Sequence, residues 1–234
     1  DTGFYTFSVS AQDYASNAPA SGSYQFYVDH EQPEGSITVA SPSVKQIDEN
    51  DWITEKDASG NYQDVIFRLY ADSNGAPLYG GKVSINNQDY QQITADKFKL
   101  IEDTADAHYG KYYVDIFINT ETVKCNDAHT YMVDAEFWTE SNNKGSASYV
   151  LHVDTSNPDI NRFTVDTKNN AVDNLLNVLT FGVFASDSLV FSVDVSDVEN
   201  DSGVDYVTIK HDGLEEPQKM IKESEGKYYA YLDI

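Results

Sequence analysis

Cysteine is nearly absent from this chain of 234 residues, which carries a single one, Cys125. One thiol cannot form a disulfide within the chain, so a hydrophobic core must hold the fold together alone. We interpret Cys125 as a small, half-buried residue near a strand end; a reactive thiol is the less favoured alternative. Zinc is also disfavoured, because the histidines are dispersed and only His129 follows the cysteine closely.

Basic residues are scarce as well, with 15 Lys and Arg against 39 Asp and Glu and a net charge of −24. Such a charge argues against nucleic acid and against anionic membranes as partners, and favours cations or basic proteins. No apolar run reaches the ~18 residues that a membrane helix needs. We therefore expect an acidic, secreted protein that binds no nucleic acid and does not insert into a membrane.

Motifs of known catalytic chemistry are also missing. The chain has no Gly-x-Ser-x-Gly elbow, no Cys/His pairing and no phosphate-binding loop. A carboxylate pair for glycoside hydrolysis remains an alternative, because a chain with 39 acidic residues always offers such pairs. A core made of repeated strands, however, leaves little room for a deep cleft. We expect that the protein is not an enzyme.

What the chain does have is a long internal repeat. The pattern Y-x-F-x-V-D followed by P in residues 24–33 recurs as Y-x-L-x-V-D followed by P in residues 149–158. G-K-Y-Y at 110–113 recurs at 226–229, and the alternating apolar residues of 65–69 recur at 189–193. A period of more than a hundred residues is one whole domain rather than a solenoid unit.

The repeat divides the chain into three parts. Residues 1–34 match the C-terminal hairpin of a preceding domain, residues 35–154 are one complete domain, and residues 155–234 match the N-terminal part of a following domain. One complete copy is large enough for its own core. We expect a window cut from a longer protein; the alternative is that the first hairpin of one molecule completes the last domain of another.

Period-two alternation predicts the strands of the complete domain. They fall at residues 36–39, 65–70, 82–85, 112–118, 131–137 and 148–154, with a hairpin turn at 142–145. Residues 41–63 and 86–106 are predicted as two long connections, and residues 94–100 are the one helix-like stretch. About seven short strands without a long helix predict an all-β fold, a β-sandwich.

A tyrosine refines that prediction to an immunoglobulin-like sandwich. Tyr131 opens a strand four residues after Asp127, and Tyr5 has the same spacing from Asp1. A tyrosine at this place can return its hydroxyl to the backbone of the preceding corner, as in the tyrosine corner of immunoglobulin-like domains.

With its Val-Asp-then-Pro junctions at 28–33 and 153–158 and the D-S-G-V turn at 201–204, the chain resembles the tandem immunoglobulin-like domains of large bacterial cell-surface proteins, of Gram-positive, Firmicute-like type. The resemblance implies an extracellular setting, at the bacterial cell surface or in the cell wall. It also implies neighbouring immunoglobulin-like domains in the same chain. Such domains serve as spacers, as adhesive domains, or as accessories of secreted carbohydrate-active enzymes.

We therefore predict a non-catalytic stalk or adhesin segment that presents, or itself forms, a surface for a host protein (mucin, matrix protein or immunoglobulin) or a glycan. The alternative is an accessory or carbohydrate-binding module of a secreted polysaccharide-degrading enzyme. The aromatic candidates for ligand binding are Trp52, Tyr62, Tyr90 and Trp138. Against this stands the interpretation that these rings are cross-strand pairs that stabilise the sheets.

Acidic residues near the second junction suggest calcium, and no other cofactor is expected. Calcium takes six to eight oxygen ligands, which carboxylates at alternate loop positions can supply. The candidates are Asp154, Asp159, Asp197, Glu199, Asp201 and Asp205. The competing interpretation is that Asp is an ordinary turn residue and that these side chains bind no ion.

Overall fold

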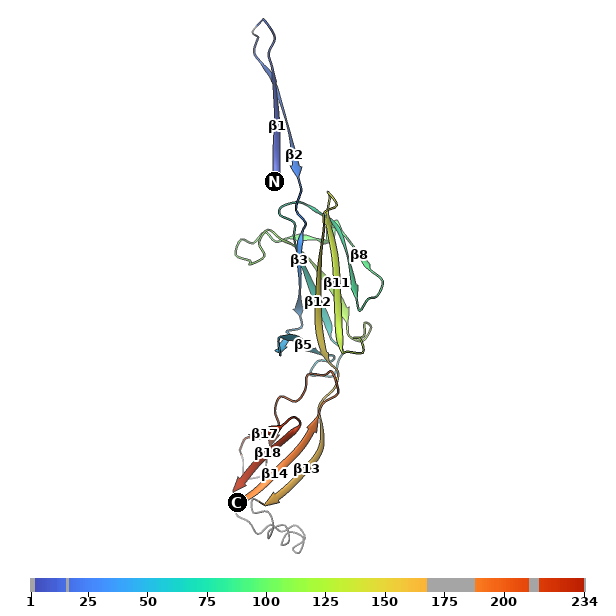
Figure 1. The fold of residues 1–234 in the computed structure, drawn as a ribbon, viewed down its shortest axis with the longest axis vertical. Coiled ribbons are helices and arrows are strands. Elements are labelled where there is room, and N and C mark those ends of the chain that lie inside the picture. Colours follow the sequence, from blue (N-terminus) through green and yellow to red (C-terminus); the bar gives the residue numbers. More distant parts are fainter. Residues whose placement is uncertain (1–2, 16, 168–187, 211–214, 234) are drawn as a thin grey trace. The chain divides into compact units, whose positions relative to one another are not determined.

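The computed structural model describes residues 3–15, 17–167, 188–210 and 215–233, and in these ranges the chain is all-β apart from one 3₁₀ turn (Figure 1). It divides into two compact units, residues 1–153 and residues 154–234. None of the described residues forms a helix that is both long and apolar enough to cross a membrane.

The first unit contains one two-stranded and two larger sheets. The two-stranded sheet pairs β1 (Gly3–Ala11) with β2 (Ala20–Val28). The four-stranded sheet has the order β3-β6-β10-β9: β3 (Glu34–Ser41), β6 (Asp64–Asp72), β10 (Tyr112–Asn119) and β9 (Lys99–Leu100). The six-stranded sheet has the order β4-β5-β12-β11-β7-β8: β4 (Lys45–Ile47), β5 (Asn50–Thr54), β12 (Lys144–Asp154), β11 (Thr130–Thr139), β7 (Leu78–Ile85) and β8 (Gln91–Thr94).

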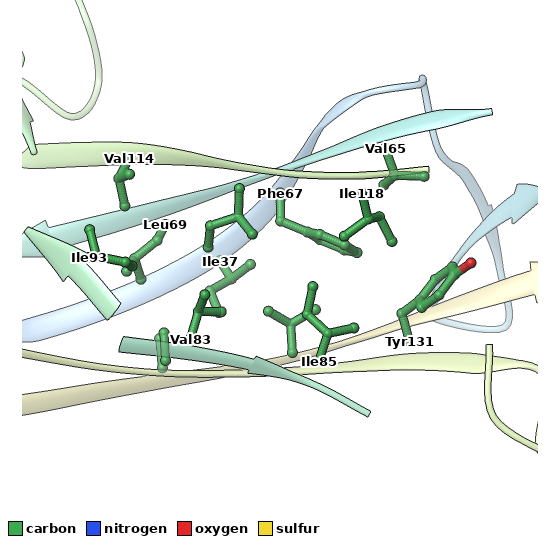
Figure 2. Packing of buried hydrophobic residues seen from close by; sticks show 14 of the residues in the cluster. Ile37, Val65, Phe67, Leu69, Val83, Ile85, Ile93, Val114, Ile118 and Tyr131 are labelled. Atoms are coloured by element: carbon green, nitrogen blue, oxygen red, sulfur yellow. The ribbon is translucent and has the colours of Figure 1, made fainter. Parts of the chain in front are cut away.

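The two larger sheets enclose one hydrophobic core (Figure 2). Val65, Phe67 and Leu69 alternate along β6 and are fully buried, because every second side chain of a strand points to the same face. Tyr131 faces them from β11 and is fully buried (Figure 2). Val133 of the same strand belongs to the same core and is fully buried too. Burying a side chain of this size stabilises the fold by roughly 1.5–3 kcal/mol, so the predicted alternation supplies the core.

The turn between β11 and β12 lies where the sequence predicts it. Asn142 has a φ of 63°, and the Thr139 amide donates to the Asn143 carbonyl oxygen at 3.0 Å. Gly145 follows, and a Cβ placed there would lie 2.1 Å from the carbonyl oxygen of Pro33 and 2.7 Å from the ring of Phe137. Only glycine lets the segment before β3 lie this close to the hairpin.

The two predicted connections differ from expectation, because each contributes strands to a sheet edge. Residues 41–63 form the β4–β5 hairpin, and residues 86–106 form β8, β9 and the 3₁₀ turn η1 (Ala95–Lys97) between them. These strands are two to five residues long. Such short strands carry too few residues for an alternation signal, so pairing with a longer neighbour decides their conformation.

The second unit contains a four-stranded and a two-stranded sheet. The larger sheet has the order β13-β14-β18-β17: β13 (Asp159–Thr167), β14 (Ser188–Ser196), β18 (Lys227–Asp233) and β17 (Ile221–Ser224). The smaller sheet pairs β15 (Thr208–Ile209) with β16 (Gln218–Lys219). The core here is smaller and centres on Val193, Val195, Met220, Tyr228 and Ala230.

Candidate functional site

The outward surface of the six-stranded sheet gathers most of the predicted aromatic residues. Tyr131, Val133 and Phe137 of β11 point into the core, so the residues between them point outward. We call this surface the outer face and define it by Trp52, Lys82, Tyr90, Met132, Asp134, Glu136, Trp138, Lys144, Ser148, Val150 and His152.

Near the β11–β12 turn, the outer face combines an aromatic ring with a charge cluster. The indole of Trp138 lies over Gly80, where an added Cβ would come within 3.1 Å of the ring. Glu136 accepts from Lys144 Nζ at 3.2 Å and lies 3.5 Å from Lys82 Nζ. The Lys144 hydrogen bond, followed by the charge of Lys82, holds the pKa of Glu136 below its ordinary value. Lys82 Nζ also lies 4.5 Å from the centre of the Tyr90 ring.

The middle of the outer face is apolar and open to solvent. Met132 and Val150 lie directly opposite each other on β11 and β12, with 37% and 47% of their surfaces exposed. Beside them, Ser148 donates a hydrogen bond of 2.6 Å to Asp134. This part of the outer face thus combines exposed apolar groups with hydrogen-bonding groups.

The far end of the outer face carries Trp52, whose ring packs on His152 with centroids 4.7 Å apart. Its indole nitrogen is buried and has no hydrogen-bond partner among the described residues. Tyr62 does not belong to this face. Lys56 Nζ and Lys124 Nζ lie 4.7 and 4.3 Å from the centre of its ring. The backbones of Tyr62 and Lys56 also form an isolated antiparallel β-bridge.

Three of the four predicted aromatic residues thus lie along one sheet surface, and each already packs on a neighbour in the chain. The sequence prediction missed the residues between them, namely Lys82, Met132, Glu136, Lys144 and Val150. Their outward positions in the alternating strands at 131–137 and 148–154 were the available signal, because the inward positions had already been assigned to the core.

A cavity of about 550 Å³ opens between the edge strands and β10. Gln91 and Gln92 of β8 line it, together with Lys97, Lys99 and Phe117, of which Phe117 has 69% of its surface exposed. Asp115 also lines it, but its carboxylate accepts two hydrogen bonds from Arg68, at 2.7 and 2.9 Å. Amide, ammonium and aromatic groups in an open groove can bind a polar ligand.

The predicted calcium residues lie in the second unit, where the structure brings three of them near one another. Thr155 and Ser156 donate their hydroxyl groups to Asp201, at 3.1 and 2.8 Å. Ser202 donates to Asp154. Burial, followed by the charges of Asp201 and Asp197, raises the pKa of Asp154.

The other three predicted ligands lie at other positions of the second unit. Asp159 opens β13 opposite Ser196, Glu199 lies in the turn after β14, and Asp205 lies between β14 and β15. No three Asp, Glu, His or Cys side chains are placed to hold a metal ion within the part of the chain that the structure describes. The protein's own hydroxyl and amide groups are hydrogen-bonded to the Asp154, Asp197 and Asp201 carboxylates, so calcium binding stays a prediction.

No family model and no curated protein matches this chain. Six chains of known structure match it. One of them belongs to a 1.5-MDa bacterial ice-binding adhesin studied for its retention on the host cell surface, with a TM-score of 0.33 and 13% sequence identity over 98% of this chain. This chain spans 63% of the length of that chain.

Proposed function

We propose that this chain is a non-catalytic segment of a bacterial cell-surface stalk or adhesin, built from tandem immunoglobulin-like domains. The observation that carries the proposal is that the chain enters and leaves the complete domain, residues 35–154, at opposite ends. A domain with this connectivity can be joined to further copies in a row.

The domain end at which the chain enters is marked by contacts to the β11–β12 turn. Thr139 Oγ1 donates to the Asp29 carboxylate at 2.7 Å, and the Asn143 amide donates to the Asp29 carbonyl oxygen at 3.1 Å. From this turn, the 11 residues of β12 run to Asp154. At 3.3 Å per residue, the chain leaves about 36 Å from where it entered.

Two features support the immunoglobulin-like assignment. The strand orders β3-β6-β10-β9 and β12-β11-β7 correspond to the A-B-E-D and G-F-C orders of immunoglobulin domains. The Tyr131 hydroxyl donates to the backbone oxygen of Val123 at 2.7 Å, which is the geometry predicted for a tyrosine corner.

Within this proposal the outer face is the binding surface, for a host protein or glycan at the cell surface. Its exposed Met132–Val150 pair suits a protein, since the buried centre of a protein interface is more apolar than the rest of the surface and Met is enriched there. Mucins, matrix proteins and immunoglobulins are the partners to test. Calcium at Asp154 and Asp201 is a separate proposal, which isothermal titration of the chain with CaCl₂ would test.

Location and binding call for two measurements. Antibodies raised against the chain should label intact, unpermeabilised bacteria, and labelling that needs permeabilisation would contradict the surface assignment. In a pull-down of host proteins and mucins, the variant Val150→Glu should lose the captured partner, while Leu100→Glu, at an exposed residue of β9 in the four-stranded sheet, should retain it. Equal capture by both variants would remove the outer face from the proposal.

A further inference from the structure

The strand β10 is paired along the whole of one edge and only in part along the other. It pairs with β6 from Tyr112 to Asn119, but with β9 only at Tyr112 and Tyr113. The chain before β9 does not run along β10, because it passes through η1 into β8 of the other sheet. No strand of the described ranges pairs with residues 114–119 on this side, so β10 presents an open edge there.

Hydrogen bonds at the two ends of β10 decide which backbone groups point to the open edge. The Thr120 amide donates to the Gln63 carbonyl oxygen at 2.9 Å, so the even-numbered residues of β10 bond to β6. On the other side, the Ile101 amide donates to the Lys111 carbonyl oxygen at 2.9 Å, so the odd-numbered residues bond to β9. The two registers agree, because successive residues of an antiparallel strand bond to opposite sides.

Two residues therefore direct their backbone to the open edge, namely Asp115 and Phe117. Each has an amide and a carbonyl group on that side. The next residue in the series is Asn119, whose carbonyl oxygen already accepts from the amides of Thr122 and Val123. A strand added in the register of β9 can form two hydrogen bonds with each of the first two residues.

The cavity of about 550 Å³ lies where that strand would run. We call it the edge groove, and it is lined by Val83 and by residues 91–93, 96, 97, 99 and 113–117. Its inner walls are apolar: Val114, Ile116 and Ile93 have at most 8% of their surfaces exposed. Val114 of β10 and Ile93 of β8 both point into the space between the sheets (Figure 2). An extended segment in the edge groove would direct every second side chain toward these walls.

The remaining side chains of such a segment would lie opposite Asp115 and Phe117. Asp115 is paired with Arg68, and Phe117 has 69% of its surface exposed. A lysine or arginine opposite them meets a carboxylate and the face of an open ring. Lysines 97 and 99 also line the edge groove, but the net charge of −24 attracts basic segments to the chain.

We propose that the edge groove binds an extended, basic peptide segment of a partner protein, which pairs with β10 at Asp115 and Phe117 as an added strand. Backbone hydrogen bonds supply affinity in this mode of recognition, and alternate apolar side chains supply specificity. The edge groove is an interaction surface separate from the outer face, and the proposal does not depend on the proposed function. The competing interpretation is that Lys97 and Lys99 only protect an open edge from pairing.

Amide hydrogen exchange of the full chain, followed residue by residue by NMR, tests the proposal with a synthetic peptide of alternating valine and lysine. In the free chain, the amides of Asp115 and Phe117 should exchange faster than that of Ile116, which bonds to β6. The peptide should slow exchange at both by about tenfold once its concentration is about ten times its Kd. Unchanged exchange at a peptide concentration on the order of 1 mM, the range of weak binding, would overturn the proposal.

Two N-methylated peptides separate strand pairing from attraction by charge. The lysines lie opposite residues 115 and 117, so their amides donate to β10, whereas the valine amides point away from it. Methylating the lysine amides should abolish the protection, and methylating the valine amides should preserve it. Both peptides have the same charge, so equal protection by both would contradict strand pairing. A peptide with glutamate in place of lysine should bind more weakly, and equal binding would contradict the basic preference.

A variant of the chain tests the register from the other side. Phe117→Pro removes an amide that points into the edge groove and leaves the hydrogen bonds to β6 in place, as at other edge prolines. It should bind the valine–lysine peptide at least about tenfold more weakly than the control Phe117→Ala, because a hydrogen bond is lost. Equal binding by the two variants would contradict the register. If the proline variant does not fold, the N-methylated peptides decide alone, since they use the unchanged chain.

These experiments measure binding in the edge groove alone. A negative outcome leaves the pull-down with Val150→Glu and the labelling of intact bacteria unaffected. Failure of this inference is thereby distinguishable from failure of the proposed function.

Discussion

At the scale of single residues, close approaches decide which substitutions the first unit tolerates. Gly35 and Gly145 both lie against the ring of Phe137, where an added Cβ would come within 2.5 and 2.7 Å of a ring carbon. Phe137 is fully buried and cannot move aside without disturbing the core. The glycine requirement is therefore a property of packing and not of turn geometry.

We predict that Gly145→Ala destabilises the first unit by about 1–3 kcal/mol, the usual cost of overpacking. The Cβ would meet the backbone oxygen of Pro33 at 2.1 Å, and backbone cannot rotate away. Chemical denaturation monitored by fluorescence measures the change. Gly22→Ala in the hairpin, where nothing lies within 4 Å, is the control and should leave the first unit unchanged. Equal stability of both variants would contradict the packing argument.

A second prediction concerns the tyrosine corner. Tyr131→Phe keeps the buried ring and removes the hydrogen bond to Val123, so unfolding of the first unit should become easier by about 1 kcal/mol. Tyr79→Phe, at an exposed ring, should change little in the same denaturation experiment. Unchanged stability in Tyr131→Phe would show that this hydrogen bond makes no net contribution to the stability of the first unit.

At the scale of elements, the predicted long strands and their turn are found, and the edge strands are the differences. β6, β10, β11 and β12 each extend a predicted strand by one or more residues. β4, β5, β8 and β9 have no alternation of their own, since each acquires its conformation by pairing with a longer strand. For the same reason Trp52, expected in a connection, lies on β5 against His152.

The segment that opens the second unit gives a prediction about pH. Burial raises the pKa of Asp154 above its ordinary value, so at neutral pH its charge costs the folded state free energy. As pH falls through the raised pKa, the folded state takes up the proton first, and the second unit becomes more stable until the pKa of the unfolded chain is reached. Denaturation at neutral and mildly acidic pH measures this gain.

Asp154→Asn should remove that part of the pH dependence, because the amide carries no charge at either pH. The control Asp159→Asn removes a carboxylate from the same unit, at the start of β13 outside the hydrogen-bonded network, and should leave the gain in place. If the second unit instead loses stability on acidification in the unchanged chain and in Asp159→Asn alike, the assignment to Asp154 is wrong.

At the scale of the whole molecule, the two compact units each have their own core. We predict two separate unfolding transitions in a calorimetric scan. Gly145→Ala should lower the transition of the first unit alone, and Val193→Ala that of the second alone, because each change acts on one core. The Val193 substitution should cost about 2 kcal/mol or more, as for other deletions of buried methyl groups. A single transition shifted by both variants would show that the units unfold together.

The amino-acid sequence by itself determined the alternation of Val65, Phe67 and Leu69, the turn at 142–145 and the return of the Tyr131 hydroxyl to the backbone of the preceding corner, since each depends on residues close in the chain or on strand periodicity. Only the tertiary structure decided that Lys82, Glu136 and Lys144 meet, and that Asp154 shares a network with Asp201. Sheet register brings Lys82, Glu136 and Lys144 together, and a shift of one position would turn a strand's side chains to the other face. Asp154 and Asp201 are joined by hydrogen bonds from Ser156 of the segment after β12 across 45 residues of chain.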